Sequence, residues 1–368
     1  MSCLHSCHDV RVSVKQAASL AKKYDVELHA IGDFKFARKN GVKLFGLPKS
    51  KRLYTRPLNW CRLLVRALRA RAGLYHFHDP ELIPVGLVLR LLGRKVIYDV
   101  HEDYPDAILH KTWIPGWARK LVSRVFNFVE KKSASFFNAV VLAESGYQES
   151  FKNVKTTKVE ILNYPLYKAN TMERPVEVHG RVNLIYAGNI SAIRGAVEMV
   201  EALHILRSAA VNAHLYLVGP VNQPGLQVKL NELARTYGLQ DHITMTGLVS
   251  HDQVYQYYRY AHIGLGLLYP VDNFLKSLAT KIFEYMAVGL PMVVSDFPGW
   301  KKLLGEVKAG VTANPLDPKE IAVQIKYLVD NPQIRADMAM AGRKAFEERF
   351  NWLTEEKKLL GLYEKLLG

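Results

Sequence analysis

Two segments in the second half of the sequence carry residue types that suit a nucleotide diphosphate. The first, residues 188–195 (GNISAIRG), follows an apolar run of strand length and opens a helical segment. Glycine lets the backbone approach a ligand closely, and the amides at a helix start favour an anion. Arg194 adds a planar cation that matches phosphate oxygens. The pattern predicts a phosphate-binding loop, although a plain structural turn can have the same sequence.

The second segment, residues 278–291, has the sequence LATKIFEYMAVGLP. At helical spacing, one face is an apolar stripe of Ala279, Ile282, Phe283 and Met286. Lys281, Glu284 and Tyr285 share a different face, at i, i+3 and i+4. A glutamate can accept hydrogen bonds from both hydroxyls of a ribose, and a lysine at a helix start can meet a diphosphate. The alternative is an ordinary surface ion pair between Lys281 and Glu284.

Histidines and carboxylates gather in three stretches of the first half: residues 5–15, 76–80 (HFHDP) and 98–105 (YDVHEDYP). Some of these side chains are of metal-binding types, namely His5, Cys7, His76 and His78. Their spacing matches no zinc pattern, so we predict no metal site. The acids of these stretches are candidates for a general base: Asp9, Asp79, Glu102 and Asp103.

Strand-length apolar runs alternate with segments of helical period along the whole chain, which predicts an α/β fold with parallel sheets. Strands are expected at Glu27–Ile31, Leu74–His78, Lys95–Asp99, Ala139–Leu142, Asn183–Ala187, Ala213–Val218, Ile243–Thr246, Ile263–Leu268 and Pro291–Ser295. Helices are expected at Val10–Tyr24, Leu58–Ala72, Glu81–Leu92, Pro115–Phe137, Lys319–Val329, Pro332–Phe350 and Leu353–Leu367. Only Met1–Leu4 precede the first loop, so the N-terminus looks short or truncated.

A chain of 368 residues exceeds the size at which one hydrophobic core stops growing, so two domains are expected. Asn163-Tyr164-Pro165 and the polar stretch Lys168–Gly180 predict a linker between them. The same alternation of elements occurs on both sides of this linker. The chain is therefore predicted to contain two copies of one architecture, with a cleft between them and ligands at the carboxyl ends of the strands.

Positive charge is concentrated in the first half. Residues 1–165 hold 28 Lys and Arg against 14 Asp and Glu, whereas residues 166–368 hold 22 against 20. This predicts an anionic partner for the first half only, such as a nucleic acid or an anionic lipid surface. Because no aromatic-rich nucleic-acid motif accompanies the charge, we expect no nucleic-acid partner.

Several features favour a cytoplasmic protein. No run approaches the roughly 18 uninterrupted apolar residues of a membrane-spanning helix. The N-terminus lacks the long apolar stretch of a signal peptide. Three cysteines are a sparse and odd set, which fits a reducing compartment.

The motifs, taken together and in this order, carry a resemblance to a known family. The pattern Lys-x-x-Glu-Tyr-x-Ala-x-Gly-x-Pro, which starts at Lys281 and leads into residues 292–295, resembles the donor-binding helix of glycosyltransferase family 4. The loop 188–195 is similar to the phosphate loop of the same GT-B fold group. The stretches 76–80 and 98–105 and the first loop resemble motifs of the family's bacterial polysaccharide-biosynthesis branch.

This resemblance implies a GT-B fold, with two Rossmann-like domains that face each other across a cleft. Residues 1–165 would form the acceptor domain and residues 166–350 the nucleotide-sugar donor domain. Residues 351–368, opened by Trp352, would form a helix that crosses back to the first domain. The enzyme would move a sugar from a UDP- or GDP-linked donor to a glycan or a lipid-linked acceptor in bacterial surface polysaccharide synthesis.

The resemblance also assigns residues. Gly188 and Arg194 would hold the diphosphate, Glu284 the ribose, and Gly219 would border the phosphates. His101 would face the donor sugar. The complete donor set is Gly188, Asn189, Arg194, Gly219, Leu248, Val249, Thr280, Lys281 and Glu284, with the Leu248 loop lining the base pocket. The acceptor-side set is His5, Asp9, Arg11, Lys15, His78, Asp79, Glu102 and Asp103.

Two positions depart from the family pattern. An arginine usually follows the phosphate-loop glycine, where this chain has Asn189, and a glutamate is common where it has Lys276. One phosphate cation is therefore lost and the sugar-side acid is absent. Lys281 or Lys276 could restore positive charge near the leaving group.

Glycosyl transfer builds negative charge on the departing diphosphate, which fixed cations and helix-start amides stabilise. We predict that Arg194 and Lys281 supply this stabilisation, with His101 as the third catalytic residue. The sequence has no Asp-x-Asp motif, so we expect no divalent metal and no cofactor. The family retains the configuration of the sugar, and we predict the same here; inversion would instead need a general base.

Two basic segments of the first half are candidates for membrane contact. Arg62, Arg66 and Arg69 align at helical spacing, and Trp113 to Trp117 precede further cations. Aromatic residues beside cations are typical of a helix that lies at a membrane interface. We therefore hypothesise that the first domain docks on an anionic membrane, on its cytoplasmic face, to reach a polyprenyl-diphosphate-linked acceptor. A solvated basic face with core-packed tryptophans is the alternative.

Two other functions fit the same fold. A non-hydrolysing nucleotide-sugar epimerase would need acid and base groups on one sugar and no acceptor. A GT-B protein that binds a nucleotide-sugar without transferring it would explain Asn189 and Lys276.

Overall fold

The computed structural model describes residues 1–50, 55–109, 111, 113–166 and 180–368. They divide into two compact units. The N-terminal unit comprises Met1–Asn163 and Trp352–Gly368, and the C-terminal unit comprises Tyr164–Asn351. The expected linker Lys168–Gly180 lies outside the described residues, except for Gly180.

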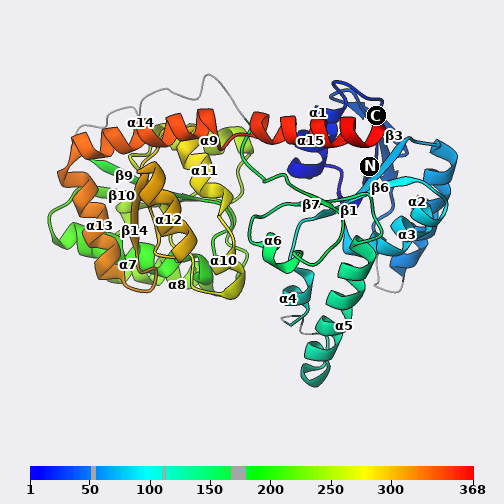
Figure 1. The fold of residues 1–368 in the computed structure, drawn as a ribbon. Coiled ribbons are helices and arrows are strands. Elements are labelled where there is room, and N and C mark those ends of the chain that lie inside the picture. Colours follow the sequence, from blue (N-terminus) through cyan, green and yellow to red (C-terminus); the bar gives the residue numbers. More distant parts are fainter. Residues whose placement is uncertain (51–54, 110, 112, 167–179) are drawn as a thin grey trace. The chain divides into compact units, whose positions relative to one another are not determined.

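The N-terminal unit is built on an eight-stranded sheet (Figure 1). In sheet order the strands are β3 (Phe36–Lys39), β4 (Val42–Leu47), β2 (Glu27–Ile31), β1 (Ser2–Ser6), β5 (Leu74–Phe77), β6 (Lys95–Val100), β7 (Ala139–Leu142) and β8 (Thr157–Glu160). All neighbours pair in parallel except β3 and β4, which are antiparallel. The helices are η1 (Val10–Ala17, π-helical), α1 (Ala18–Leu20), α2 (Arg56–Ala70), η3 (Pro80–Leu82), α3 (Ile83–Leu91), α4 (Tyr104–Leu109), α5 (Gly116–Ala134), α6 (Tyr147–Ser150) and α15 (Trp352–Leu367).

Four of these strands lack a counterpart among the predicted ones. Strand β1 covers most of Met1–Leu4, the stretch expected before the first loop, and extends to Ser6; it lies in the middle of the sheet, between β2 and β5. Strands β3 and β4 form a hairpin whose turn is Asn40-Gly41, both with positive φ (49° and 78°). Asn-Gly is a strong signal for such a two-residue turn, so this hairpin could have been found from the sequence. The fourth unpredicted strand is the edge strand β8.

The last helix, α15, belongs to the N-terminal unit, as the resemblance predicted. Trp352 is 2% exposed, and its indole Nε1 donates a hydrogen bond to Ser19 Oγ at 2.9 Å. Further along the helix, the Tyr363 hydroxyl lies 2.9 Å from His76 Nδ1 on β5. The last helix of the chain thus packs into the core of the N-terminal unit, against residues from the first hundred positions of the sequence.

The C-terminal unit contains a six-stranded, fully parallel sheet. In sheet order the strands are β11 (Ile243–Met245), β10 (Ala213–Val218), β9 (Val182–Ala187), β12 (Ile263–Gly266), β13 (Met292–Ser295) and β14 (Gly310–Ala313). The helices are η5 (Ala192–Arg194), α7 (Ala196–Ser208), α8 (Leu226–Thr236), η6 (Gln240–His242), α9 (His251–Tyr260), α10 (Asp272–Lys276), α11 (Thr280–Ala287), α12 (Pro298–Val307), α13 (Pro318–Asp330) and α14 (Pro332–Glu348). Strand β14 was not predicted.

The order of these strands, 3-2-1-4-5-6 within the unit, is that of a Rossmann fold. The chain leaves β9 toward one side of the sheet and β12 toward the other. A crevice for ligands opens at such a switch point, at the carboxyl ends of the two strands. The loop 188–195 follows β9, and the helix α11 follows β12, so both predicted motifs stand at this point.

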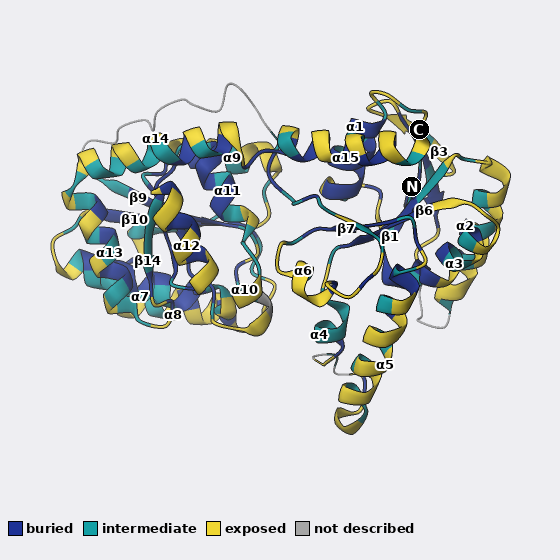
Figure 2. Cartoon of the chain, in the orientation of Figure 1, coloured by how far each residue is buried: buried dark blue, intermediate teal, exposed yellow. Residues whose placement is uncertain are grey.

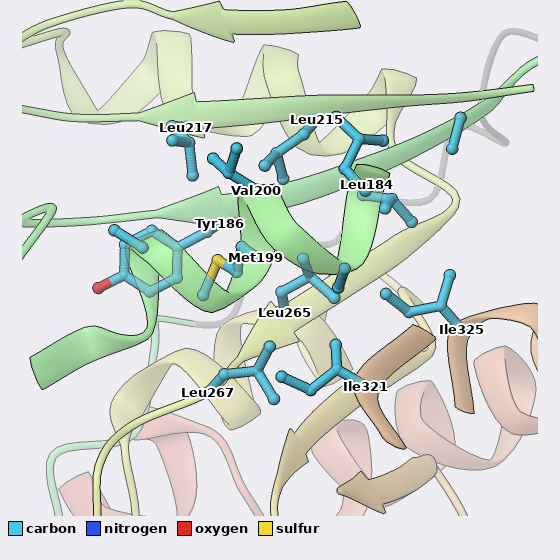
Figure 3. Close-up of a cluster of buried hydrophobic side chains, with 14 of the residues drawn as sticks. Leu184, Tyr186, Met199, Val200, Leu215, Leu217, Leu265, Leu267, Ile321 and Ile325 are labelled. Atoms are coloured by element: carbon cyan, nitrogen blue, oxygen red, sulfur yellow. The ribbon is translucent and has the colours of Figure 1, made fainter. Parts of the chain in front are cut away.

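The core of the C-terminal unit lies between the sheet and its helices (Figure 3). Leu184, Leu215 and Leu265 project from three neighbouring strands and pack against Met199 of α7. From the other covering helix, α13, Ile321 joins them. These strands are apolar along most of their length because helices cover both faces of the sheet.

We expect Trp352→Ala to destabilise the N-terminal unit by roughly 3–5 kcal/mol, because it deletes a buried indole and leaves a cavity. Urea unfolding followed by circular dichroism measures this. The control is Lys357→Ala, at an exposed position of the same helix. Equal stability of the two variants would show that α15 is not part of the core.

Candidate active site

The phosphate loop begins at a contact between two glycines. Gly188 and Gly219 follow β9 and β10, with φ of 138° and 139°, and the Gly188 N–H donates to Val218 O at 2.8 Å. A Cβ on Gly219 would lie 2.1 Å from Gly188 O. A side chain at Gly219 would clash with the backbone of Gly188, so the two loops can approach this closely only because position 219 is glycine.

Gly195 ends the loop and starts α7. Its φ of 72° is left-handed, and a Cβ there would lie 2.2 Å from Leu267 O. The loop therefore packs directly against the chain that leaves β12. Arg194 sits on the short helix η5 just before this glycine, and its position is fixed by the turn.

Lys281 stands at the start of α11 and reaches the phosphate loop. Its Nζ would lie 2.9 Å from a Cβ on Gly188, and it lies 5.0 Å from the centroid of the Tyr186 ring. Burial lowers the pKa of Lys281; the nearby Glu284 opposes this shift and Arg194 adds to it. Two cations from different elements thus share one small region.

Tyr186, the next-to-last residue of β9, joins these groups. Its hydroxyl donates to Asn189 O at 3.0 Å and also interacts with Arg194. Burial raises the pKa of Tyr186, and Arg194 opposes that shift. Tyr186 therefore serves as the common neighbour of the loop, Arg194 and Lys281.

Glu284 lies one helical turn after Lys281, and it has a partner that the sequence did not indicate. The hydroxyl of Tyr258, on α9, donates to Glu284 Oε2 at 2.9 Å. Tyr258 is 3% exposed and packs edge-on against Tyr285, with ring centroids 5.6 Å apart. Among the ion pairs of the described residues, none joins Lys281 to Glu284, so the surface-pair alternative is wrong.

One prediction for this helix needs correction. Tyr285 does not share an open face with Lys281 and Glu284; it is 0% exposed, and its hydroxyl donates to Leu265 O at 2.8 Å. The i+4 spacing put it on that face, but α11 packs against the sheet along this line. Tyr285 anchors the helix that carries the other two residues.

The remaining donor-side residues lie around the loops. Asn189 Oδ1 accepts a hydrogen bond from Asn222 Nδ2 at 3.2 Å. Gly219 N donates to Thr246 Oγ1 at 3.2 Å, which brings the Thr246–Val249 loop beside the phosphate loop. Leu248 on that loop is 82% exposed. Thr280 and Lys276 are exposed as well, at the start of α11 and at the end of α10.

In the N-terminal unit, several polar side chains surround one buried carboxylate, that of Asp99. Asp99, 0% exposed, accepts from Arg11 Nη2 at 3.1 Å and from Gln16 Nε2 at 2.6 Å. His101 Nε2 lies 3.2 Å from Asp99 Oδ1, and the side chain of His101 is 16% exposed. Burial alone would raise the pKa of Asp99, but Arg11, followed by His101, holds it well below its usual range. The sequence did not single out Asp99.

His76 and His78 also border Asp99, at 3.6 and 3.4 Å. Burial lowers the pKa of both imidazoles, which favours their neutral form. These two histidines and Asp99 are close enough to hold one metal ion. Arg11, however, already neutralises Asp99, and its fixed positive charge opposes a divalent cation there.

Two predicted acceptor-side cations are buried. Arg11 is 6% exposed and bound to Asp99, and Lys15 is 5% exposed with its Nζ 2.8 Å from Asn163 Oδ1. The resemblance assigned both residues to the acceptor side, but their side chains are buried within the unit. In this unit both side chains link segments that are far apart in sequence.

The four candidate general bases separate by environment. Asp9 and Asp103 accept backbone amides at the starts of η1 and α4. Asp79 is 5% exposed; it accepts from Leu4 N at 2.5 Å and lies 2.8 Å from His5 Nε2. Its carboxylate raises the pKa of His5 to about 9. Glu102 is exposed.

Family models match both units. Residues 4–164 match a glycosyl transferase 4-like domain, and residues 168–345 match glycosyl transferases group 1. The chain belongs to the family 4 glycosyltransferases. It is therefore a transferase of the EC 2.4 class, and the epimerase and the non-catalytic binding protein are set aside.

Individual relatives agree with this assignment. Alpha-D-kanosaminyltransferase of Streptomyces kanamyceticus is 26% identical over 298 residues, 76% of this chain and 73% of that protein. Sucrose-phosphate synthase of Thermosynechococcus elongatus has a TM-score of 0.75 at 16% identity, covering 99% and 98% of the two chains. HepE of Anabaena, solved in complex with UDP, has a TM-score of 0.74 at 15% sequence identity, and the match covers 99% of each chain. The solved structures show that the glycosyltransferase has a GT-B fold.

In this glycosyltransferase we expect Tyr258→Phe to weaken the binding of UDP or GDP roughly tenfold. A hydrogen bond to a charged group contributes about 1.5–3 kcal/mol, and without it the Glu284 carboxylate loses its fixed orientation. Discrimination between the nucleotide and its 2′,3′-dideoxy form should shrink in parallel, as isothermal titration calorimetry can measure. Tyr257→Phe, one residue away on α9, is the control. Unchanged discrimination in Tyr258→Phe would contradict this role.

Proposed function

We propose that this glycosyltransferase takes its sugar from a UDP- or GDP-linked donor bound by the C-terminal unit. One observation carries the proposal: Arg194, Lys281 and Glu284 converge beside Gly188, around Tyr186. Two cations beside an exposed backbone suit a diphosphate, and a carboxylate one helical turn away suits a ribose. The complexes of HepE with UDP and with UDP-glucose support this choice of donor.

In the proposed reaction the bond between the anomeric carbon and the phosphate oxygen breaks, and the acceptor oxygen bonds to that carbon. The electron pair of the broken bond goes to the diphosphate, where Arg194 and Lys281 stabilise the new charge. We propose transfer with retention, in which the departing phosphate oxygen takes the acceptor's proton. A protein base is then unnecessary. This agrees with the hydrogen bonds of three of the four candidate acids: Asp9, Asp79 and Asp103 already accept from backbone amides.

We propose that the reaction needs no divalent metal and no cofactor. Metal ions in such reactions neutralise the diphosphate, and here Arg194 and Lys281 supply two positive charges. We propose that Lys281, whose Nζ would lie 2.9 Å from a Cβ on Gly188, supplies the charge of the arginine missing at position 189. This is the residue-level basis for metal independence.

The proposed acceptor is a glycan or a polyprenyl-diphosphate-linked saccharide of bacterial surface polysaccharide synthesis, met at the cytoplasmic side of an anionic membrane. The net charge of +14 over residues 1–165 favours such a surface. WaaG, a glycosyltransferase involved in lipopolysaccharide biosynthesis, has the same fold, with a TM-score of 0.70. Within the part of the chain that the structure describes, no helix is long and apolar enough to cross a membrane.

The donor assignment predicts that UDP or GDP raises the melting temperature without added divalent ion, since a ligand that binds the native state stabilises it. Glu284→Ala should lose this shift, because the ribose loses its acceptor. A thermal-shift panel of nucleotide diphosphates measures both effects. Glu232→Ala, an exposed acid on α8, should respond like the wild type. A full response in Glu284→Ala would place the donor site elsewhere.

Lys281→Met should lower kcat on the order of a hundredfold, because one of two charges at the leaving group is lost. The same change should raise the melting temperature of the free enzyme, since it removes a buried charge whose pKa burial lowers. Transfer assays with and without EDTA, together with thermal melts, separate the two effects. Lys302→Met, at an exposed position, should change neither. Wild-type turnover that stops in EDTA would overturn metal independence.

A further inference from the structure

Helix α5 exposes a stripe of large apolar side chains along its length, in a region where Figure 2 shows most of the helix as exposed. Trp117, Leu121 and Phe128 are 84%, 61% and 63% exposed. Their spacing of four and seven residues places them within about 40° of one another around the helix. Val125 (54%) lies beside them, and Trp113 (64%) precedes the helix.

The opposite face of α5 packs against the rest of the unit, so the apolar stripe points outward. Tyr98 on β6 donates to Glu130 Oε1 at 2.8 Å, and Ser123 Oγ donates to Pro105 O at 2.7 Å. Phe126 packs against Tyr104 with ring centroids 5.7 Å apart. The helix is thus already packed by this face, and the apolar stripe is not its inward side.

The charges around the stripe all have the same sign. Lys120, Arg124 and Lys132 are exposed beside it. The helix contains one acidic residue, Glu130, which is 1% exposed and bound to Tyr98. An exposed apolar stripe flanked only by cations complements a surface that is anionic outside and apolar below.

We propose that α5 lies on an anionic lipid bilayer, with Trp117, Leu121 and Phe128 inserted between the headgroups and Lys120, Arg124 and Lys132 against the lipid phosphates. The inference deepens the proposed function by naming the docking surface. It rests on the proposed function only for the reason why the enzyme would bind a membrane. The observations behind it are independent of the donor site, because α5 and the donor residues belong to different units.

The sequence contains two basic segments that are candidates for membrane contact, and the structure favours the one that contains α5. On α2, Arg66 donates to Gly46 O at 3.1 Å, and Arg56 pairs with Glu81. Arg62 donates to the side chain of Asn59 at 3.1 Å. These three arginines of α2 are engaged inside the unit. Helix α2 also exposes apolar side chains, Leu58, Val65 and Leu68, but they are less exposed (57%, 46% and 39%) than Trp117, Leu121 and Phe128 of α5.

A second copy of the chain is a poorer occupant than a lipid surface. In a two-fold dimer the same patch meets itself, so the cations of both stripes would face each other. Like charges brought together at an interface oppose association. An anionic bilayer relieves this repulsion.

The test uses the full chain and sedimentation with vesicles of phosphatidylcholine alone or with 30% phosphatidylglycerol, at low and at high salt. We expect the wild type to bind the anionic vesicles and the triple variant Trp117→Ser, Leu121→Ser, Phe128→Ser to bind at least tenfold more weakly. Lys120→Gln, Arg124→Gln, Lys132→Gln should lower binding at low salt and flatten its salt dependence.

The matched control replaces Leu91, Leu92 and Phe136 by serine; they are 86%, 54% and 64% exposed in the same unit. This variant should bind like the wild type. Equal vesicle binding by the stripe variant, or loss of binding in the control instead, overturns the proposal. So does a wild-type dimer in sedimentation velocity that the stripe variant abolishes, when vesicle binding is unchanged.

Nucleotide response separates this inference from the proposed function. The stripe variant should keep the thermal shift with UDP or GDP, which also shows that it is folded. If vesicles bind the wild type but no nucleotide stabilises it, the donor proposal fails and the docking surface stands.

Discussion

The constraint on which the site depends is that two cations, Arg194 and Lys281, are held together with no carboxylate bound to either among the described ion pairs. Burial already lowers the pKa of Lys281, and Arg194 lowers it further. Such a pair costs stability in the free protein, and an anion between the two charges recovers that cost. The nearest acid, Glu284, accepts its hydrogen bond from Tyr258 instead. The two positive charges thus lack a negative partner among the described ion pairs, and the proposed diphosphate would supply one.

The fold creates this constraint with backbone geometry. A Cβ on Gly219 would clash with Gly188 O, and a Cβ on Gly195 would clash with the carbonyl oxygen of Leu267. These contacts hold the chains that leave β9, β10 and β12 at one end of the sheet. Tyr285, buried below α11, anchors the helix that carries Lys281 and Glu284. The charged groups are therefore positioned by neutral, buried contacts.

The sequence could predict what depends on period and spacing. The alternation of apolar runs located four of the eight strands of the N-terminal sheet and five of the six strands of the C-terminal sheet, and the glycines of 188–195 located the loop. It could not predict contacts between distant residues: Tyr258 lies 26 residues before Glu284, and Asp99 lies 88 after Arg11. It also placed Tyr285 by spacing on a face that the sheet covers. Strand β1 was not predicted because only the four residues Met1–Leu4 were expected before the first loop, whereas the Asn40-Gly41 hairpin has a sequence signal that could have been recognised.

Charge in the N-terminal unit follows a different logic from charge in the C-terminal unit. Arg11 and Lys15 are buried and satisfied inside it, by Asp99 and by Asn163. The cations left outside include those beside the exposed apolar stripe of α5, where the helix buries its single acid. Burying an acid while exposing bases makes the outer face of that helix more positive than its composition. The exposed apolar side chains of this face are unfavourable in water, whereas the cations beside them are not. The proposed anionic bilayer would cover the apolar side chains and pair the cations at the same time.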